Sequence, residues 1–279
     1  METIGDQRVR FGELSGRLVH GGTLFDWQLV STQEFAEAYG YSFEEILADD
    51  GIPYAPVVVQ TSVDRYPRTG DAITVETVPI SAGDTSVELC YEVTDESGDS
   101  LMTTRIVHVT IDDEGTALEL PDAVREAFID DCVDRDPVVG PEDEPAGEES
   151  DVSFASSFDV RSPYIEGAEL AYFENYPNFA TIAIEHHLEA NDTSLPELRG
   201  EKHPYRIRDW QWQFKSPVLF GTTLEVECDV ETVSEDTIRV AQEFSTDGRT
   251  NIEAVSEYGC FDADGKPAPY DDEMLEPFL

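Results

Sequence analysis

The chain is short of positive charge, and of lysine above all. Its 279 residues contain 17 Lys plus Arg against 61 Asp plus Glu, so the formal net charge at pH 7 is -44. The lysines are Lys202, Lys215 and Lys266. Because nucleic acids and anionic membranes repel such a surface, we expect neither to be a partner. The acidic residues are spread along the whole chain, which is typical of proteins from organisms in molar salt, where the Debye length is about 3 Å. The composition therefore predicts a halophilic protein.

Cysteine and long apolar runs are also scarce. The four cysteines, at positions 90, 132, 228 and 260, form no C-x-x-C pair and no metal-like spacing, so we expect reduced thiols and no metal site. His186 and His187 are adjacent, and adjacent residues of a helix point in different directions. No stretch reaches the roughly 18 apolar residues of a membrane span, and the N-terminus lacks the apolar core of a signal peptide. These absences predict a soluble, cytoplasmic protein.

The chain is similar to itself at a constant spacing. The dipeptide Pro-Tyr at 53–54 recurs at 204–205, and Gly70 recurs as Gly221, in both cases 151 residues later. Matches that keep one order and one offset indicate two related halves.

An acidic stretch separates these halves. Residues 134–153 read DRDPVVGPEDEPAGEESDVS, which is rich in Pro, Gly and carboxylates and has no apolar periodicity. Such a composition is typical of a linker. We therefore predict a first domain at 1–133, a linker at 134–153 and a second domain at 154–279.

Each half predicts a long helix followed by strands. Residues 24–39 place apolar side chains at helical spacing, and a shorter helix is expected at 42–48. Residues 173–190 take the same part in the second half, with Pro177 in the first turn or at a kink. Residues 224–231 alternate between apolar and acidic side chains, as a strand with one buried face does. The order predicts an α+β fold.

Residues 8–27, RVRFGELSGRLVHGGTLFDW, precede the helix, and a Y-P-x-x-G-D turn follows at 66–71. This combination resembles the hotdog-fold acyl-CoA thioesterases over roughly residues 8–120, and the likeness is only architectural over 155–265. The resemblance implies a tandem, or double, hotdog in which an antiparallel sheet wraps around a long central helix in each half. It also implies hydrolysis of acyl-CoA or acyl-carrier-protein (ACP) thioesters. The two halves would form a pseudo-dimer within one chain, as in the plant acyl-ACP thioesterases, with further homo-oligomerisation left open.

Thioester hydrolysis needs a carboxylate as base or nucleophile and N–H groups that polarise the carbonyl. In the 4-hydroxybenzoyl-CoA-like branch of this family, an Asp stands three residues before the first Gly of a G-x-V-x-H-type segment. Glu13 has that spacing to Gly16. The resemblance therefore makes Glu13 the first candidate for the catalytic carboxylate, and a solvated surface charge is the alternative.

A second motif, HGGTLF at residues 20–25, resembles the H-G-G-x-L-F segment of the phenylacetyl-CoA-type branch. Glycines at a helix start leave N–H groups free to hold a thioester oxygen. The oxyanion candidates are Gly21, Gly22 and Thr23. His20 is a catalytic candidate beside them, with helix capping as its alternative. That branch carries its acid nine residues after the His, where this chain has Leu29, so Asp26 is a weaker substitute for Glu13.

One basic cluster, at 199–215, interrupts the acidic background and is interleaved with Tyr205, Trp210 and Trp212. Cationic side chains suit the phosphates of coenzyme A, and an aromatic ring suits its adenine. The candidates for coenzyme A binding are Lys202, Arg206, Arg208 and Lys215. Balancing of nearby carboxylates is the alternative. The coenzyme A thioester would be the substrate, and no separate cofactor is expected.

The second half lacks the Gly-Gly pair, so we expect it to shape the acyl tunnel or the coenzyme A groove. Asn175 and Asn178 could contribute to the site from the facing helix, and ordinary polar residues at a helix end are the alternative. Two other functions remain open. An enoyl-CoA hydratase or dehydratase of the same superfamily would carry a D-x-N-P-x-H-type segment, which is absent. A non-catalytic acyl-CoA binding protein is the second alternative. Acyl chain length and the choice between coenzyme A and ACP stay open.

Overall fold

The computed structural model describes residues 1–112, 114–138, 141 and 147–279. The predicted linker therefore lies partly outside the described residues. The short strand β8 (Glu148–Glu149) falls within its range and pairs with the second half of the sheet.

One antiparallel sheet of twelve strands runs through both halves. In the first half, the strands lie in the order β1 (Glu2–Arg8), β5 (Ala72–Ala82), β6 (Ser86–Asp95), β7 (Ser100–Ile111) and β4 (Ile52–Val63). The second half has the equivalent order from its own edge, namely β9 (Ser153–Asp159), β11 (Thr223–Val233), β12 (Thr237–Thr246), β13 (Arg249–Phe261) and β10 (His203–Phe214). The central strands β4 and β10 pair with each other, so the two half-sheets are continuous. The remaining short strands are β2 (Leu14–Ser15), β3 (Leu18–Val19) and β14 (Pro267–Ala268).

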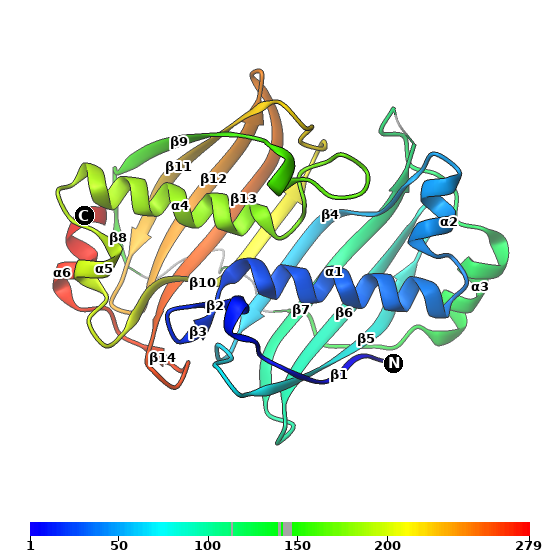
Figure 1. The fold of residues 1–279 in the computed structure, drawn as a ribbon, viewed down its shortest axis with the longest axis horizontal. Helices are drawn as coiled ribbons and strands as arrows, with labels where there is room; N and C mark the ends of the chain where they lie inside the picture. Colours follow the sequence, from blue (N-terminus) through cyan, green and yellow to red (C-terminus); the bar gives the residue numbers. More distant parts are fainter. Residues whose placement is uncertain (113, 139–140, 142–146) are drawn as a thin grey trace.

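Two long helices cover one face of this sheet. Figure 1 shows α1 (Gly21–Ala38) and α4 (Asn175–Ala190) starting near the middle of the molecule and running outward in opposite directions. The shorter helices are α2 (Phe43–Ala48), α3 (Asp122–Asp131), α5 (Leu195–Leu198) and α6 (Asp272–Leu275), with 3-10 turns η1 (Phe11–Glu13), η2 (Ser162–Tyr164) and η3 (Glu276–Phe278). The starts of α1 and α4 therefore lie together where the two halves join.

The predicted helices are present, but both long helices begin at other residues than predicted: α4 begins at Asn175 and not at Phe173. Helix α1 begins at Gly21 and not at Leu24, because His20 caps it and accepts the Thr23 N–H at Nδ1 over 3.2 Å. The two glycines thus form the first turn instead of preceding it. Pro177 lies in the first turn of α4, where a missing N–H is harmless.

The two central strands bend at corresponding places. Tyr54 in β4 has φ 44° and Tyr205 in β10 has φ 57°, a left-handed conformation that is uncommon for non-glycine residues. The pairing register shifts around both positions, as it does at a β-bulge. These are the tyrosines of the repeated Pro-Tyr dipeptide, so the two halves bend alike at matching residues.

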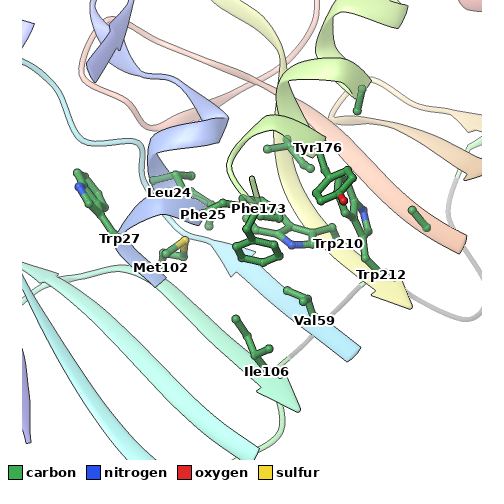
Figure 2. Close-up of a cluster of buried hydrophobic side chains, with 14 of the residues drawn as sticks. Leu24, Phe25, Trp27, Val59, Met102, Ile106, Phe173, Tyr176, Trp210 and Trp212 are labelled. Carbon is green, nitrogen blue, oxygen red and sulfur yellow. The ribbon is translucent and has the colours of Figure 1, made fainter. Parts of the chain in front are cut away.

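Aromatic side chains fill the junction between the halves (Figure 2). The Phe25 ring of α1 stacks on Trp210 of β10 at 4.9 Å between centroids and meets Phe173 at 4.8 Å. Phe25 and Trp210 are completely buried. Burial of each such ring contributes about 1.5–3 kcal/mol. The buried residues of both halves form one hydrophobic cluster, which positions the start of α1 against β10.

A buried histidine lies within the first half. His108 donates from Nδ1 to the Tyr54 carbonyl over 2.7 Å, and its Nε2 lies 2.8 Å from the Tyr91 hydroxyl. Burial lowers the pKa of His108 to about 4, although the Tyr54 hydrogen bond opposes this shift. The imidazole is therefore neutral at pH 7.

The free energy of unfolding should fall as the pH is lowered from 7 to 5. In that window the unfolded chain protonates His108 near its ordinary 6.5 while the folded chain does not, and the loss from this residue is about 2 kcal/mol. Urea unfolding at both pH values, for the wild type and for His108→Gln, measures it. The variant should lose this part of the pH dependence, whereas the exposed His186→Gln should retain it. If the free energy of unfolding fell equally with pH in the wild type and in His108→Gln, His108 would not be the source of the pH dependence.

Candidate functional site

A pocket of about 410 Å³ opens where the two halves meet. Ser15, His20 and Gly21 line it from the first half. Asn178 and Glu185 of α4 and Arg206 of β10 are among the residues that line it from the second half. The pocket therefore combines the start of one helix with the side of the other.

The start of α1 offers free backbone donors to this pocket. The Thr23 N–H is already taken by His20. Within the described part of the chain, no acceptor contacts the Gly21 N–H, which belongs to the first turn. Such N–H groups, together with the helix dipole, stabilise negative charge on a nearby oxygen. The Gly21 N–H can therefore stabilise negative charge on an oxygen bound at the start of α1.

His20 supports this helix start. Its Nε2 lies 3.1 Å from the Oγ1 of Thr23, a buried residue. Burial lowers the pKa of His20, as does the Arg206 charge, while the carboxylates of Glu13 and Asp26 oppose the shift. A neutral imidazole can accept the Thr23 N–H, so the capping role left open above is observed, and it is compatible with His20 also lining the pocket.

Gly22 permits the two helices to approach closely. A Cβ on Gly22 would lie 2.7 Å from Asn178 Nδ2 and 2.8 Å from the Glu174 carbonyl oxygen of the facing segment. Real Cβ atoms do not come so near backbone atoms. The second glycine therefore serves helix packing, and Asn178 lies against the first half at this point.

Glu13 lies beside the site but does not line the pocket. Its carboxylate accepts the Arg10 N–H and, over 3.4 Å, the Gln7 side-chain amide. Its main-chain carbonyl accepts the His20 N–H over 3.0 Å. The side chain is therefore folded back onto η1, and a catalytic role for Glu13 stays a prediction.

Asp26 also lies outside the pocket lining. It accepts a hydrogen bond from the Tyr172 hydroxyl across the junction. Besides burial, the Asp26 charge raises the pKa of both Tyr172 and Glu174. Asp26 thus links α1 to the segment that leads into α4.

Glu185 is the carboxylate that the sequence reasoning missed. It is the acidic side chain among the described residues that line the pocket, on α4 and half-buried. Burial is the first cause that raises the pKa of Glu185, followed by the Glu189 charge, while Arg206 opposes the rise. No motif surrounds Glu185 in the sequence, and the only signal is a carboxylate beside an apolar stretch of a predicted helix.

The four predicted coenzyme A ligands do not form one site. Lys202 bonds to Asp271 and to the Pro269 carbonyl at one end of β10, whereas Lys215 pairs with Glu253 beyond the other end. Arg208 pairs with Asp209 at 3.2 Å. Only Arg206 lines the pocket.

Arg206 is held in place by backbone of the first half. Its guanidinium donates to the carbonyls of Ser15 and Val19 and lies 5.8 Å from the centre of the Tyr66 ring. An arginine in such contacts presents a fixed charge to the pocket. Arg206 therefore connects the hairpin of the first half to the pocket wall of the second.

The described residues do not favour metal-dependent or thiolate catalysis. Among them, no group of three His, Cys, Asp or Glu side chains is arranged to hold a metal ion. Burial raises the pKa of the Cys90 and Cys260 thiols to about 11, which disfavours a thiolate nucleophile. No helix in the described ranges is long and apolar enough to cross a membrane.

Comparison with known proteins identifies the fold. Residues 27–128 match the family model described as the acyl-ACP thioesterase N-terminal domain. The candidate residues Glu13 to Asp26 precede that range. No curated protein sequence matches the chain significantly.

Three solved structures cover nearly the whole chain. A protein provisionally described as an oleoyl thioesterase from Lactobacillus plantarum has a TM-score of 0.72 at 12% identity, over 91% of this chain and 94% of its own. The 12:0-ACP thioesterase from Umbellularia californica has a TM-score of 0.69 at 14% identity, over 94% and 96%. An acyl-ACP thioesterase from Bacteroides thetaiotaomicron has a TM-score of 0.66 at 17% identity, over 90% and 95%. The chain therefore has the hotdog-like α+β fold seen in these thioesterases.

Proposed function

We propose that the protein is an acyl-thioester hydrolase acting on acyl-CoA or acyl-ACP. The observation that carries this proposal is the pocket that Gly21, at the start of α1, and Glu185, on α4, both line. A donor for a developing oxyanion and a carboxylate base are the two groups that thioester hydrolysis needs. The thioesterase names of the structural neighbours and of the matched family model agree with it.

In the proposed reaction, the thioester oxygen lies at the start of α1 and Glu185 removes a proton from water. The water oxygen then bonds to the carbonyl carbon, and the negative charge on the carbonyl oxygen is stabilised by the Gly21 N–H. When the carbonyl re-forms, the C–S bond breaks and the proton passes to the thiolate that leaves. Glu13 remains the alternative carboxylate, and His20 holds the helix start in position.

Release of free thiol from acyl thioesters tests the function. Purified protein, assayed with acyl-CoA and acyl-ACP of several chain lengths at high salt, should release thiol that reacts with a chromogenic disulfide. Loss of the ultraviolet absorbance of an enoyl thioester without thiol release would instead indicate a hydratase. Binding without either change would indicate an acyl-CoA binding protein. Either of these two results would overturn the proposal.

We further propose that the two halves are tandem hotdog units, with the domain limits given above, that pair within one chain. The matching strand orders and the matching bends at Tyr54 and Tyr205 support this reading. Assembly beyond the single chain, cytoplasmic location and adaptation to high salt stay predictions from the sequence.

A further inference from the structure

A small group of cationic side chains surrounds the β2–β3 hairpin beside the pocket. The two-residue turn of this hairpin consists of Gly16, with φ 72°, and Arg17. A Cβ on Gly16 would lie 3.1 Å from the His203 ring and 3.6 Å from an Arg199 guanidinium nitrogen. The hairpin turn of the first half thus packs directly on the basic segment of the second half.

The charges in this group act on one another. His203 is buried, and burial lowers its pKa to about 4 with further contributions from Arg206, Arg199 and Arg17. Asp262 is the carboxylate that opposes this shift. Three arginines therefore lie near enough to disfavour a fourth positive charge, in a chain whose net charge is -44.

None of the three arginines forms an ion pair with a residue that the structure describes; Arg206 donates to backbone carbonyls instead. Arginines elsewhere, such as Arg65 and Arg239, contact two carboxylates each. Arg17 and Arg199 are exposed, and neither forms an ion pair with any residue that the structure describes. Like charges that are clustered and form no ion pair repel one another, and a bound anion relieves that repulsion. These three arginines are therefore arranged as a site for an anionic ligand.

The group is adjacent to the rim of the pocket. Arg17 follows the lining residue Ser15 by two positions, and Arg199 is the C-cap of the short helix α5, which begins at the lining residue Leu195. Arg206 belongs to both, because it lines the pocket and bonds to the Ser15 carbonyl. A ligand whose reacting end lies at Gly21 could therefore place a charged part among the arginines.

We propose that Arg17, Arg199 and Arg206 form an anchor for a phosphate ester on the carrier arm of the thioester. This inference rests on the proposed function, because a thioester of coenzyme A or of a carrier protein has a neutral reacting end and a phosphorylated pantetheine arm. Guanidinium groups bind phosphate through paired, charge-assisted hydrogen bonds. The neutral His203 can also form a hydrogen bond to the phosphate through a ring nitrogen, without adding a positive charge.

Binding of pantetheine and 4′-phosphopantetheine, measured by calorimetry at one fixed salt concentration, tests the anchor. The wild type should bind the phosphorylated compound at least about tenfold more tightly, as expected for charge-assisted hydrogen bonds. The double substitution Arg17→Ala with Arg199→Ala should reduce this preference to about threefold or less. Arg249→Ala, which removes an exposed arginine of a distant turn, should leave it unchanged.

Further results separate the possible outcomes. A wild type without preference, or a preference that survives the double substitution, would overturn the anchor even if the protein hydrolyses thioesters. A preference without hydrolysis would leave the anchor standing and reject the proposed function. If coenzyme A binds more tightly than 4′-phosphopantetheine, the nucleotide phosphates take part. If the two bind equally, the anchor binds only the 4′-phosphate, which is also present on the pantetheine arm of carrier proteins.

Discussion

Glu185→Gln should lower kcat for thioester hydrolysis by about 10²- to 10⁴-fold, the usual contribution of a positioned base. The amide keeps the size of the side chain and cannot accept a proton from water. Glu189→Gln, one helical turn further along α4 and exposed, is the matched control and should retain activity. Thiol release under saturating substrate measures the effect, and an active Glu185→Gln enzyme would reject this residue as the base.

The same experiment decides between the two carboxylates. The sequence favours Glu13, and for that residue the expectation is that Glu13→Gln abolishes thiol release while the fold persists. The structure places Glu185 and not Glu13 in the pocket lining. Since the pKa of Glu185 is raised by burial above its ordinary 4.5, kcat/KM should increase with pH through that raised value, as Glu185 ionises. Loss of activity only in the Glu13 variant would return the role to Glu13.

Gly22→Ala should destabilise the protein by about 1–3 kcal/mol, as overpacking does, and should also lower kcat. The added methyl group would meet Asn178 and the Glu174 carbonyl, so the starts of α1 and α4 must separate. Alanine favours helix by up to about 1 kcal/mol over glycine, so a net loss means that the clash dominates. Urea unfolding and thiol release measure the two effects.

Gly12→Ala is the control for this substitution, because a Cβ there would meet nothing within 4 Å. Gly22→Ala combined with Asn178→Ala should recover part of the lost stability, but not all, since the Glu174 carbonyl remains in place. A stable and fully active Gly22→Ala protein would show that the close approach of the helices is not required.

Local patterns in the sequence were enough to predict the two long helices and α2. Apolar spacing predicted α1 and α4, and Ser42 with Glu45 forms the reciprocal cap that starts α2. Helix α3 was missed because it is short and strongly acidic; its apolar face depends on Phe128, which packs against Phe35 and Tyr39. A helix whose stability depends on packing against residues far away in the sequence cannot be predicted from its own residues alone.

The site was predicted only in part for the same reason. His20 and Gly21 are linked by local motif and capping chemistry, so the sequence could place them at a helix start. Lys202 and Lys215 are close in the sequence, but an extended strand of about 3.3 Å per residue separates them widely. Sequence proximity therefore suggested a cluster that strand geometry does not allow.

By itself, the sequence determined the acidic character, the long helices and the position of His20 and Gly21 at the start of α1, because composition, periodicity and capping act over a few residues. Only the tertiary structure decided which carboxylate enters the pocket and which arginines gather at its rim. Glu185 and Arg206 line one pocket with the first-half residue Gly21, and Arg199 lies beside Gly16, because β4 pairs with β10 and α1 packs against α4. Contacts between segments so far apart in the chain depend on the packed core, and no local pattern encodes them.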